Sequence, residues 1–252
     1  MAVLDKYDTR APKDLEKQKT KEDTSKLLKQ LNDLQNRLWA NAKQSVLVVL
    51  QGIDASGKDG VINNVFGALS LQGVAVHAFK VPTEEEKAHD FLWRVHQNAP
   101  PKRMIGVFNR SHYEDVLITR VHGWCDDETA KRRFKAINDF EQLLSDHNNT
   151  IILKFYLHIS KDEQEERLKE RKEMPNKAWK YNAGDLEERK LWDKYMEMYE
   201  EVFANCSAIP WTIVPADQNW YKEYLVAKTV VKALEELNMQ YPLPKLEADA
   251  SS

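Results

Sequence analysis

Residues 47–60 read LVVLQGIDASGKDG. In this stretch an apolar strand leads into a loop where Gly52 and Gly57 frame four residues and Lys58 follows, which is the spacing of a Walker A phosphate loop. Glycines let the backbone wrap an anion without side-chain clashes, and successive N–H groups then point inward. Lys58 adds a positive charge, and the helix predicted to follow presents its positive end. The alternative, a glycine-rich surface turn, is disfavoured because a strand precedes the loop and a helical pattern follows it.

Two acids set this loop apart. Asp59 stands where most Walker A loops have Ser or Thr, and Asp54 lies inside the loop. Two carboxylates in an anion cradle would repel phosphate unless a divalent cation lies between them. The sequence therefore predicts a metal-assisted phosphate site, with Asp54 as a metal ligand. The phosphate-binding residues expected from the loop are Gly52, Ala55, Ser56, Gly57, Lys58, Asp59 and Gly60.

The composition excludes several classes of function. With 252 residues and a net charge of −3, the chain has no global basic surface, which argues against a nucleic-acid partner held by overall charge. The two cysteines, Cys125 and Cys206, are far apart and lack metal-ligand partners at a useful spacing, as expected in a reducing compartment. No signal peptide and no stretch apolar enough to span a membrane is visible. We expect a soluble cytoplasmic protein without a membrane partner.

Apolar runs and helical patterns alternate along the chain. Strands are predicted at 46–51, 74–81, 104–109, 150–157 and 211–215, and helices at 58–70, 84–97, 112–121, 128–147, 160–173, 185–204 and 219–238. This alternation indicates an α/β fold, with a mostly parallel sheet covered on both faces, whose ligands bind beyond the carboxyl ends of the strands. We expect one domain over 1–252 with an inserted helical lid at about 160–190.

The N-terminal part predicts a long amphipathic helix at about 14–44. Its leucines, from Leu15 through Leu27 and Leu31 to Leu38, recur at helical spacing. Two interpretations stay open: the apolar face contacts another copy of the chain, or it packs on its own domain.

Polar residues follow the third predicted strand, where a Walker B element should lie. Asn109 replaces the usual metal-binding Asp, Arg110 comes next, and Glu114 and Asp115 follow one turn later. Glu114 and Asp115 could supply the missing metal-binding oxygen. The alternative is that they only complement a helix dipole.

Further cations are candidates for phosphate contacts. Arg167 and Arg171 are four residues apart, share a helix face and precede a helix–loop–helix of the kind that forms kinase lids. The alternative is a solvated helix laced by Glu–Arg pairs. Lys80 and Arg94 flank a Pro-rich bend and could guide a long polyanion, or be ordinary surface charge.

In combination these segments resemble the polyphosphate kinase 2 family. The resemblance rests on GIDASGKDG, VPTEEEKAHDFLWRVH, FNRSHYEDVLITRVHGW and the lid pattern EQEERLKERKEMPNKAWKYNAGDLEER, and it spans about residues 7–236. The Tyr113-Glu114-Asp115 triplet with Asn109 resembles the subclass that phosphorylates AMP as well as ADP. One departure is Arg103-Met104, where family members often have a glycine before the Walker B strand.

The resemblance implies a three-layer α/β/α P-loop fold related to thymidylate kinase. It implies transfer of the terminal phosphoryl group of inorganic polyphosphate to AMP and ADP, giving ADP and ATP, with Mg²⁺ or Mn²⁺ as cofactor and a dimer or tetramer as the assembly. The resemblance implies catalytic roles for Asp54, Lys58, Arg110, Asp115, Arg167 and Arg171. It implies metal binding by Asp54, Glu114 and Asp115, and nucleotide or phosphate binding also by Asn109 and Glu114. The polyphosphate channel would be lined by Lys80 and Arg94. Two alternatives stay open: an ATP-dependent nucleotide kinase, and a P-loop nucleotide-binding switch.

Overall fold

The computed structural model describes residues 2–175, 177–180, 182 and 184–243. A sheet of five parallel strands runs through this part of the chain, in the order β2-β3-β1-β4-β5. The strands are β1 (Ser45–Gln51), β2 (Val74–Ala78), β3 (Ile105–Asn109), β4 (Thr150–His158) and β5 (Trp211–Pro215). β1 is buried along its whole length, as its continuous apolar sequence predicts for a strand covered on both faces.

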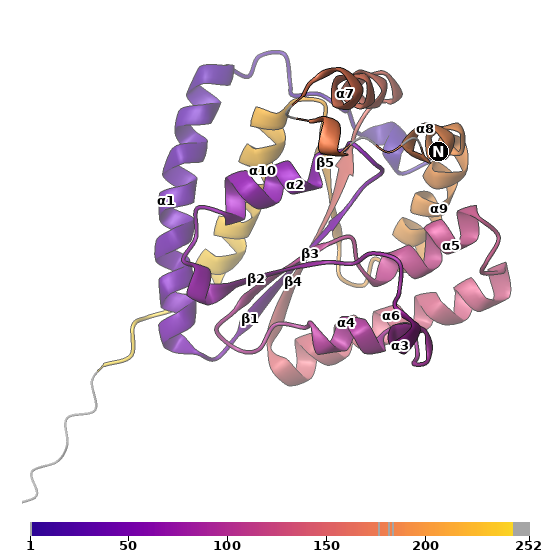
Figure 1. The fold of residues 1–252 in the computed structure, drawn as a ribbon. Helices are drawn as coiled ribbons and strands as arrows, with labels where there is room; N and C mark the ends of the chain where they lie inside the picture. Colours follow the sequence, from indigo (N-terminus) through magenta and orange to yellow (C-terminus); the bar gives the residue numbers. More distant parts are fainter. Residues whose placement is uncertain (1, 176, 181, 183, 244–252) are drawn as a thin grey trace, which may run out of the picture.

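Helices cover both faces of the sheet, which confirms the three-layer prediction (Figure 1). On one face α10 (Asn219–Glu236) packs against β4 and β5, and α1 (Lys17–Asn41) packs on α10. On the other face α6 (Asp127–Asn148) contacts β4, and α9 (Trp192–Asn205) packs beside α5 (Ile118–Val121). The remaining helices are α2 (Lys58–Val61), α3 (Glu84–Lys87), α4 (Trp93–Gln97), α7 (Lys161–Glu173) and α8 (Gly184–Lys190).

Several predicted helices are broken where the sequence predicts continuous ones. The helix expected at 58–70 is α2 followed by a π-helical segment, Ile62–Phe66, and it ends before Gly67. The helix expected at 84–97 divides into α3 and α4, because the Asp90 carboxylate accepts the Leu92 N–H at 2.9 Å and forms a turn. The helix expected at 112–121 is a 3₁₀ segment, His112–Val116, and then α5. The helix expected at 185–204 is interrupted at Leu191, between α8 and α9.

The apolar face of α1 lies inside its own chain. Leu31, Leu34 and Leu38 belong to the hydrophobic core, and the core they join includes Val226 and Val230 of α10. The intramolecular interpretation of this helix therefore accounts for these leucines. None of the helices in the described part of the chain is long and apolar enough to cross a membrane.

Because the strands are parallel, their carboxyl ends lie at one edge of the sheet. The loop after β1, the residues after β2 and β3, the start of α7 after β4, and the turn between β5 and α10 all meet there. This is the edge at which open α/β sheets bind ligands.

Candidate active site

The loop after β1 has the backbone geometry of an anion cradle. Gly52 and Gly57 have positive φ angles of 151° and 94°, and a Cβ on Gly52 would lie 2.7 Å from the Ser56 Oγ. Ala55 also lies in the left-handed region, with φ of 63°. Non-glycine residues adopt this region at a cost and gather at functional sites, so the loop shape is imposed by its surroundings.

Three cations are directed at the carbonyl oxygens of this loop. The Lys58 ammonium donates to the Gly52 and Ile53 carbonyls at 2.7 and 3.1 Å. Arg167 of α7 donates to the Ala55 carbonyl at 3.0 Å, and Lys222 of α10 donates to the Ser56 carbonyl at 3.2 Å. Burial lowers the pKa of Lys58 to about 8, with the Arg110 charge acting in the same direction. The positive charge is thus concentrated around the loop.

Arg167 joins three elements of the site. Besides the loop it binds the carbonyls of Ala216 and Asp217 after β5, at 2.8 and 2.9 Å, and its Nε pairs with Glu163 at 2.9 Å. The guanidinium group therefore connects α7, the phosphate loop and the β5–α10 turn. Of the alternative interpretation, a solvated helix laced by Glu–Arg pairs, only the pairing with Glu163 applies to Arg167.

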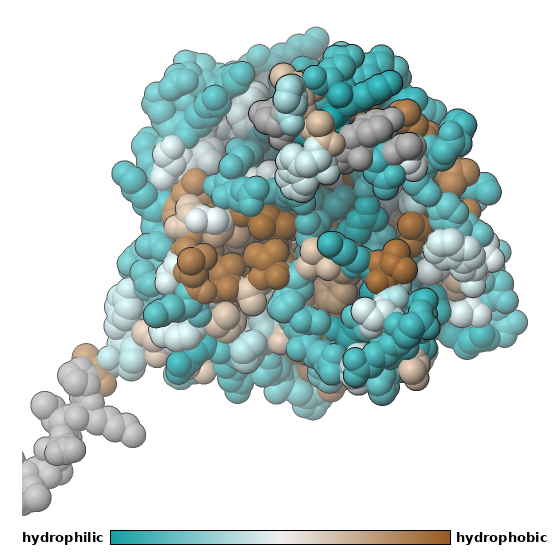
Figure 2. Space-filling view, in the orientation of Figure 1, coloured by the Kyte–Doolittle hydropathy of each residue, from teal (hydrophilic) through white to brown (hydrophobic). Residues whose placement is uncertain are grey.

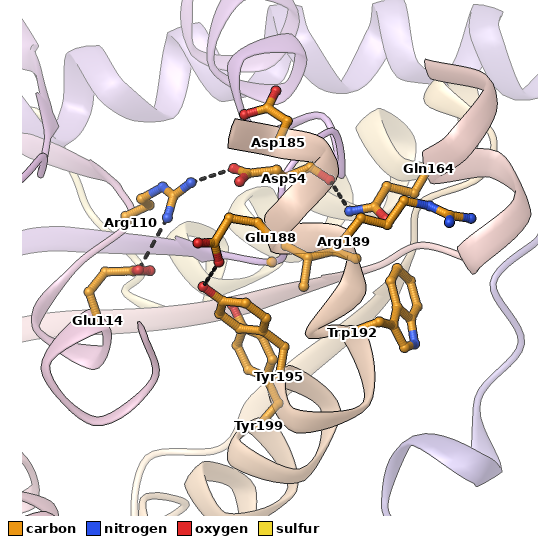
Figure 3. A pocket seen from close by; sticks show the side chains of 12 residues that line it. Asp54, Arg110, Glu114, Gln164, Asp185, Glu188, Arg189, Trp192, Tyr195 and Tyr199 are labelled. Carbon is orange, nitrogen blue, oxygen red and sulfur yellow. Dashed lines mark hydrogen bonds and ion pairs between the residues drawn. The ribbon is translucent and has the colours of Figure 1, made fainter. Parts of the chain in front are cut away.

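Arg110 lies directly after β3 between two acids, one from the loop and one from its own turn (Figure 3). It pairs with Asp54 and, at 3.2 Å, with Glu114. These carboxylates, Glu114 foremost, raise its pKa above the ordinary arginine value. Its φ of 63° is a further strained backbone position at the site. The neighbouring Asn109 donates to the Asp59 carboxylate at 2.9 Å, so Asn109 ties the loop to β3.

A buried polar network fixes the turn that carries Glu114. The Tyr113 hydroxyl donates to Glu141 at 2.6 Å and accepts from Lys154 at 2.8 Å, and Lys154 also pairs with Glu141 at 2.7 Å. A fully hydrogen-bonded buried network holds one geometry. Tyr113, Glu141 and Lys154 thereby position the polar residues that follow β3.

The predicted metal ligands are not brought together as a set. Asp54 and Glu114 both contact Arg110, but Asp115 turns away from them. Its carboxyl lies 3.6 Å from Arg94, and burial raises its pKa. Among the described residues no group of three or more His, Cys, Asp or Glu side chains could hold a metal ion. A metal ion here would need oxygen ligands from a substrate as well, which is how Mg²⁺ is usually bound beside phosphates.

Two cavities flank Asp54. The wider one, of about 570 Å³, is called the loop cavity, and it is lined by Asp54, Ala55, Gly57, Lys58, Asp59, Gly60, Ala78, Phe79, Lys80, Asn109, Arg110, Arg167, Glu170, Arg171, Lys177, Trp179 and Asn219. The space-filling view shows the middle of this face hollowed and hydrophilic, with an apolar surface beside it over β2 and α2 (Figure 2).

The second cavity lies under α8 and has a volume of only about 20 Å³ (Figure 3). We call it the lid cavity; its lining is Gly52, Ile53, Asp54, Arg110, Glu114, Gln164, Asp185, Glu188, Arg189, Trp192, Tyr195 and Tyr199. Around this cavity, side chains of α7 and α8 pair with each other, and α7 also contacts the phosphate loop. Arg171 pairs with Asp185 at 2.9 Å, Arg189 pairs with Glu165 at 2.7 Å, and Gln164 donates to the Asp54 carbonyl at 3.0 Å.

Of the two residues predicted for the polyphosphate channel, only one lines the loop cavity. Lys80 lines the loop cavity. Arg94 does not: it is 6% exposed, donates to the Lys80 carbonyl at 2.8 Å, and lies over the Phe79 ring. This corrects the channel assignment of Arg94, because a guanidinium buried between Phe79, Glu86 and Asp115 cannot line an open channel.

The other predicted residues fall at or near the two cavities. Asp54 and Arg110 line both, Gly52 and Glu114 line the lid cavity, and most remaining loop residues line the loop cavity. Ser56 is buried and Asp115 lines neither cavity. Sequence reasoning missed Lys222, Asn219, Gln164 and the aromatic residues of α9. The one available signal is Lys222, which occupies the same helical stripe as Val226, Val230 and Leu234, where a lysine is unexpected.

The chain is similar to proteins of one known family. A family model described as polyphosphate kinase 2 matches residues 14–242. The AMP/ADP-polyphosphate phosphotransferase of Meiothermus ruber is 48% identical over 235 residues, which are 92% of this chain and 88% of that protein. The ADP-polyphosphate phosphotransferase of Rhodopseudomonas palustris is 42% identical over 229 residues, 85% of this chain and 79% of that one. The crystal structure of polyphosphate kinase 2 from Arthrobacter aurescens TC1 has a TM-score of 0.94 and 42% identity, and the match covers 98% of this chain and 89% of that one.

Proposed function

Because the chain belongs to the polyphosphate kinase 2 family, we propose that it transfers the terminal phosphoryl group of inorganic polyphosphate to AMP and to ADP. The products are ADP or ATP and a polyphosphate shorter by one phosphate, and the reaction is reversible. Acceptance of AMP as well as ADP is supported by the printed name of the 48% identical relative and by the Tyr113-Glu114-Asp115 triplet.

The observation that carries the proposal is the loop cavity. Lys58, Lys80, Arg167 and Arg171 line it together with the backbone of a phosphate loop, and its volume of about 570 Å³ is open to a chain of phosphates. Phosphoryl transfer needs positioning and neutralisation of charge more than a nucleophilic side chain. The cavity supplies both without any group that would have to form a covalent intermediate.

A divalent cation fits the acids at this site. We propose Mg²⁺, or Mn²⁺ in its place, held by Asp54 together with phosphate oxygens. When bound, the ion would neutralise charge on the transferring phosphoryl group. Glu114 lines the lid cavity beside Asp54 and pairs with Arg110, whereas Asp115 lies against Arg94 and lines neither cavity.

The acceptor would meet the donor at Asp54 and Arg110, which line both cavities. The lid cavity, at about 20 Å³, is narrow, and we propose that α8 moves when an acceptor enters beneath it. Arg171 and Arg189, released from Asp185 and Glu165, would then be free to bind phosphate oxygens. Lid closure over a transferring phosphate excludes water.

The test is an assay of the purified full chain with one donor at a time. With polyphosphate and Mg²⁺ we expect ATP from ADP, ADP and then ATP from AMP, and no product after EDTA is added. Activity with ATP as the donor and none with polyphosphate would favour the ATP-dependent kinase. Slow hydrolysis without transfer would favour the nucleotide-binding switch. A chain that converts ADP but gives no product from AMP would limit the acceptor to ADP.

We further propose that residues 1–252 act as one domain, that copies assemble as a dimer or tetramer, and that the protein is cytoplasmic. The free thiols Cys125 and Cys206, both buried, suit a reducing compartment. Light scattering after size-exclusion chromatography would give the subunit number, and a monomer would contradict the assembly.

A further inference from the structure

Lys222 is a buried lysine on α10 that lies behind the phosphate loop. Its ammonium group donates to the Ser56 carbonyl at 3.2 Å and to the Asn219 side-chain oxygen at 2.8 Å. The loop is shaped around it, since a Cβ on Gly57 would lie 2.0 Å from the Lys222 Nζ. Gly57 is therefore needed for the approach of Lys222 as well as for its positive φ.

Among the described residues, the acceptors of the Lys222 ammonium are neutral oxygens, although the group is fully buried. Arg167 of α7 and Lys58 of α2 add positive charge near it, while Glu163 of α7 and Glu223 of α10 oppose them from a distance. Burial, reinforced by Arg167, lowers the pKa of Lys222 to about 7. A buried cation that lacks a paired anion is costly, and a phosphate in the loop would supply that anion.

We propose that Lys222 is a positioning residue of the donor site, which holds the Ser56–Gly57 backbone and supplies buried positive charge behind the phosphates of bound polyphosphate. It acts through the loop because it does not line the loop cavity itself. This inference rests on the proposed function in one respect: it takes polyphosphate as the anion that binds at the loop. If it is correct, Lys222 affects the affinity for polyphosphate, the donor, and does not affect the affinity for the nucleotide acceptor.

The test compares Lys222→Met with Lys228→Met, an exposed lysine of the same helix that serves as the matched control. Methionine keeps an unbranched side chain that is one atom shorter, and it removes the charge and the donor. We expect Lys222→Met to raise KM for polyphosphate about tenfold, with KM for ADP and kcat at saturating polyphosphate within about twofold of the parent. Lys228→Met should change none of the three.

Thermal melting separates this role from a structural one. Removing a buried charge without a paired anion should leave the melting temperature unchanged or raise it. A variant that melts well below the parent and loses kcat and both affinities together would show Lys222 to be a structural support and overturn the proposal. An unchanged KM for polyphosphate in a folded variant would also overturn it.

Binding calorimetry needs no turnover, so it tests Lys222 even if the enzymatic function is wrong. Inorganic polyphosphate is titrated into the full chain at pH 8 in two buffers of different ionisation enthalpy. We expect proton uptake in the parent chain, uptake that persists in Lys58→Met, and less uptake in Lys222→Met. Should Lys222→Met fail to fold, the first two measurements decide: absence of uptake in the parent, or its complete loss in Lys58→Met, would overturn the proposal.

Discussion

At the phosphate loop, Lys58 and Lys222 donate to neutral oxygens, whereas the arginines that contact the lid are paired with carboxylates. Arg171, which lines the loop cavity, pairs with Asp185 of α8, and Arg189, which lines the lid cavity, pairs with Glu165. In the described part of the chain, no acid contacts the ammonium groups of Lys58 and Lys222. The two arginines are cations whose charge is already balanced. An anion entering the loop cavity gains uncompensated charge at once, but an anion under the lid must first replace a carboxylate. The difference indicates a preformed donor site and an acceptor site that forms when the lid moves.

The largest expected effect comes from the loop. Lys58→Met should lower kcat about 10³-fold, because a positioned cation at the transferring phosphates is lost. The melting temperature should not fall, since the charge is buried and its pKa is lowered to about 8. Lys43→Met, a lysine ahead of β1, is the control for general effects of losing a lysine. A near-normal kcat in folded Lys58→Met would show that the phosphate loop does not contribute to catalysis.

The next effect tests the residue shared by both cavities. Asp54→Asn is nearly isosteric and should lower kcat about 10²-fold, since the amide cannot replace the charge that holds a metal ion. It should also weaken the apparent affinity for Mg²⁺, which a titration of activity against Mg²⁺ measures. Asp115→Asn is the comparison variant, because Asp115 lies against Arg94 and lines neither cavity. If Asp115→Asn, and not Asp54→Asn, shifts the Mg²⁺ dependence, the metal site is at Asp115.

Arg167 and Arg171 of α7 both line the loop cavity but differ in their partners. Arg167→Ala removes hydrogen bonds to carbonyls of the loop and of the β5–α10 turn, so we expect it to cost about 2 kcal/mol of stability and to lower kcat. Arg171→Ala removes one pairing with Asp185 and should lower kcat about tenfold with little change in melting.

Lysine at position 171 should restore little, because it lacks the planar fork that binds two oxygens at once. Lys169→Ala, an exposed change on the same helix, controls for the loss of a cation. Unchanged kcat in Arg171→Ala would return this end of α7 to the solvated-helix interpretation. A melting temperature unaffected by Arg167→Ala would show that its carbonyl contacts do not stabilise the fold.

Much of this arrangement follows from the sequence, and the rest depends on packing. The strands and the phosphate loop are predictable because their apolar runs and glycine spacing are local signals. The burial of Arg94 is not, since it depends on Phe79, Glu86 and Asp115 coming together in three dimensions. The contact of Lys222 with the loop is not predictable either, since Lys222 lies 166 positions from Ser56 in the sequence.

The helix interruptions and the lid cavity show the same limit. A helical pattern over 185–204 does not reveal the break at Leu191, because the apolar periodicity continues on both sides of it. Tyr195 and Tyr199 of α9 have the spacing of ordinary core residues, and their place in the lid cavity depends on where α8 lies.

The unmatched charge at the loop also predicts a pH dependence. In the free protein the pKa values of Lys58 and Lys222 are lowered to about 8 and about 7, and a bound phosphate favours the protonated forms. Affinity for polyphosphate should therefore fall as pH rises from about 7 to 9, by up to about tenfold per unit for each proton taken up.

The stability of the free protein should change in the opposite direction. Unfolded lysines keep pKa values near 10.4, so between about pH 7 and 8 the unfolded state binds more protons at Lys58 and Lys222, and the folded state is favoured as pH rises. Above that range the buried Cys206 thiol, whose pKa is raised to about 12, acts in the opposite direction. Calorimetric binding and denaturant unfolding across this range measure the two trends. An affinity for polyphosphate that stays constant from pH 7 to 9 would contradict the unmatched charge at the loop.

The smallest effect is expected far from both regions, at Arg103 in the turn before β3, around which the family resemblance leads us to expect a glycine. Its φ is 76°, its N–H donates to the Gln44 carbonyl at 2.6 Å, and its guanidinium lies 4.9 Å from the Trp39 ring. The left-handed conformation costs an arginine roughly 1 kcal/mol that a glycine avoids, while the ring contact returns about half of that. Arg103→Gly should therefore change the melting temperature by less than about 2 °C.

Activity should not change at all in this variant, because the turn precedes β3 and lies at the opposite edge of the sheet from the carboxyl ends that build the site. Arg103→Asn, which tolerates the same conformation and removes the same charge, is the matched variant. The measurement is KM for polyphosphate and thermal melting in both. If both raise KM for polyphosphate equally while melting stays constant, the donor chain extends to Arg103, and the uncompensated charge that attracts it is not confined to the loop.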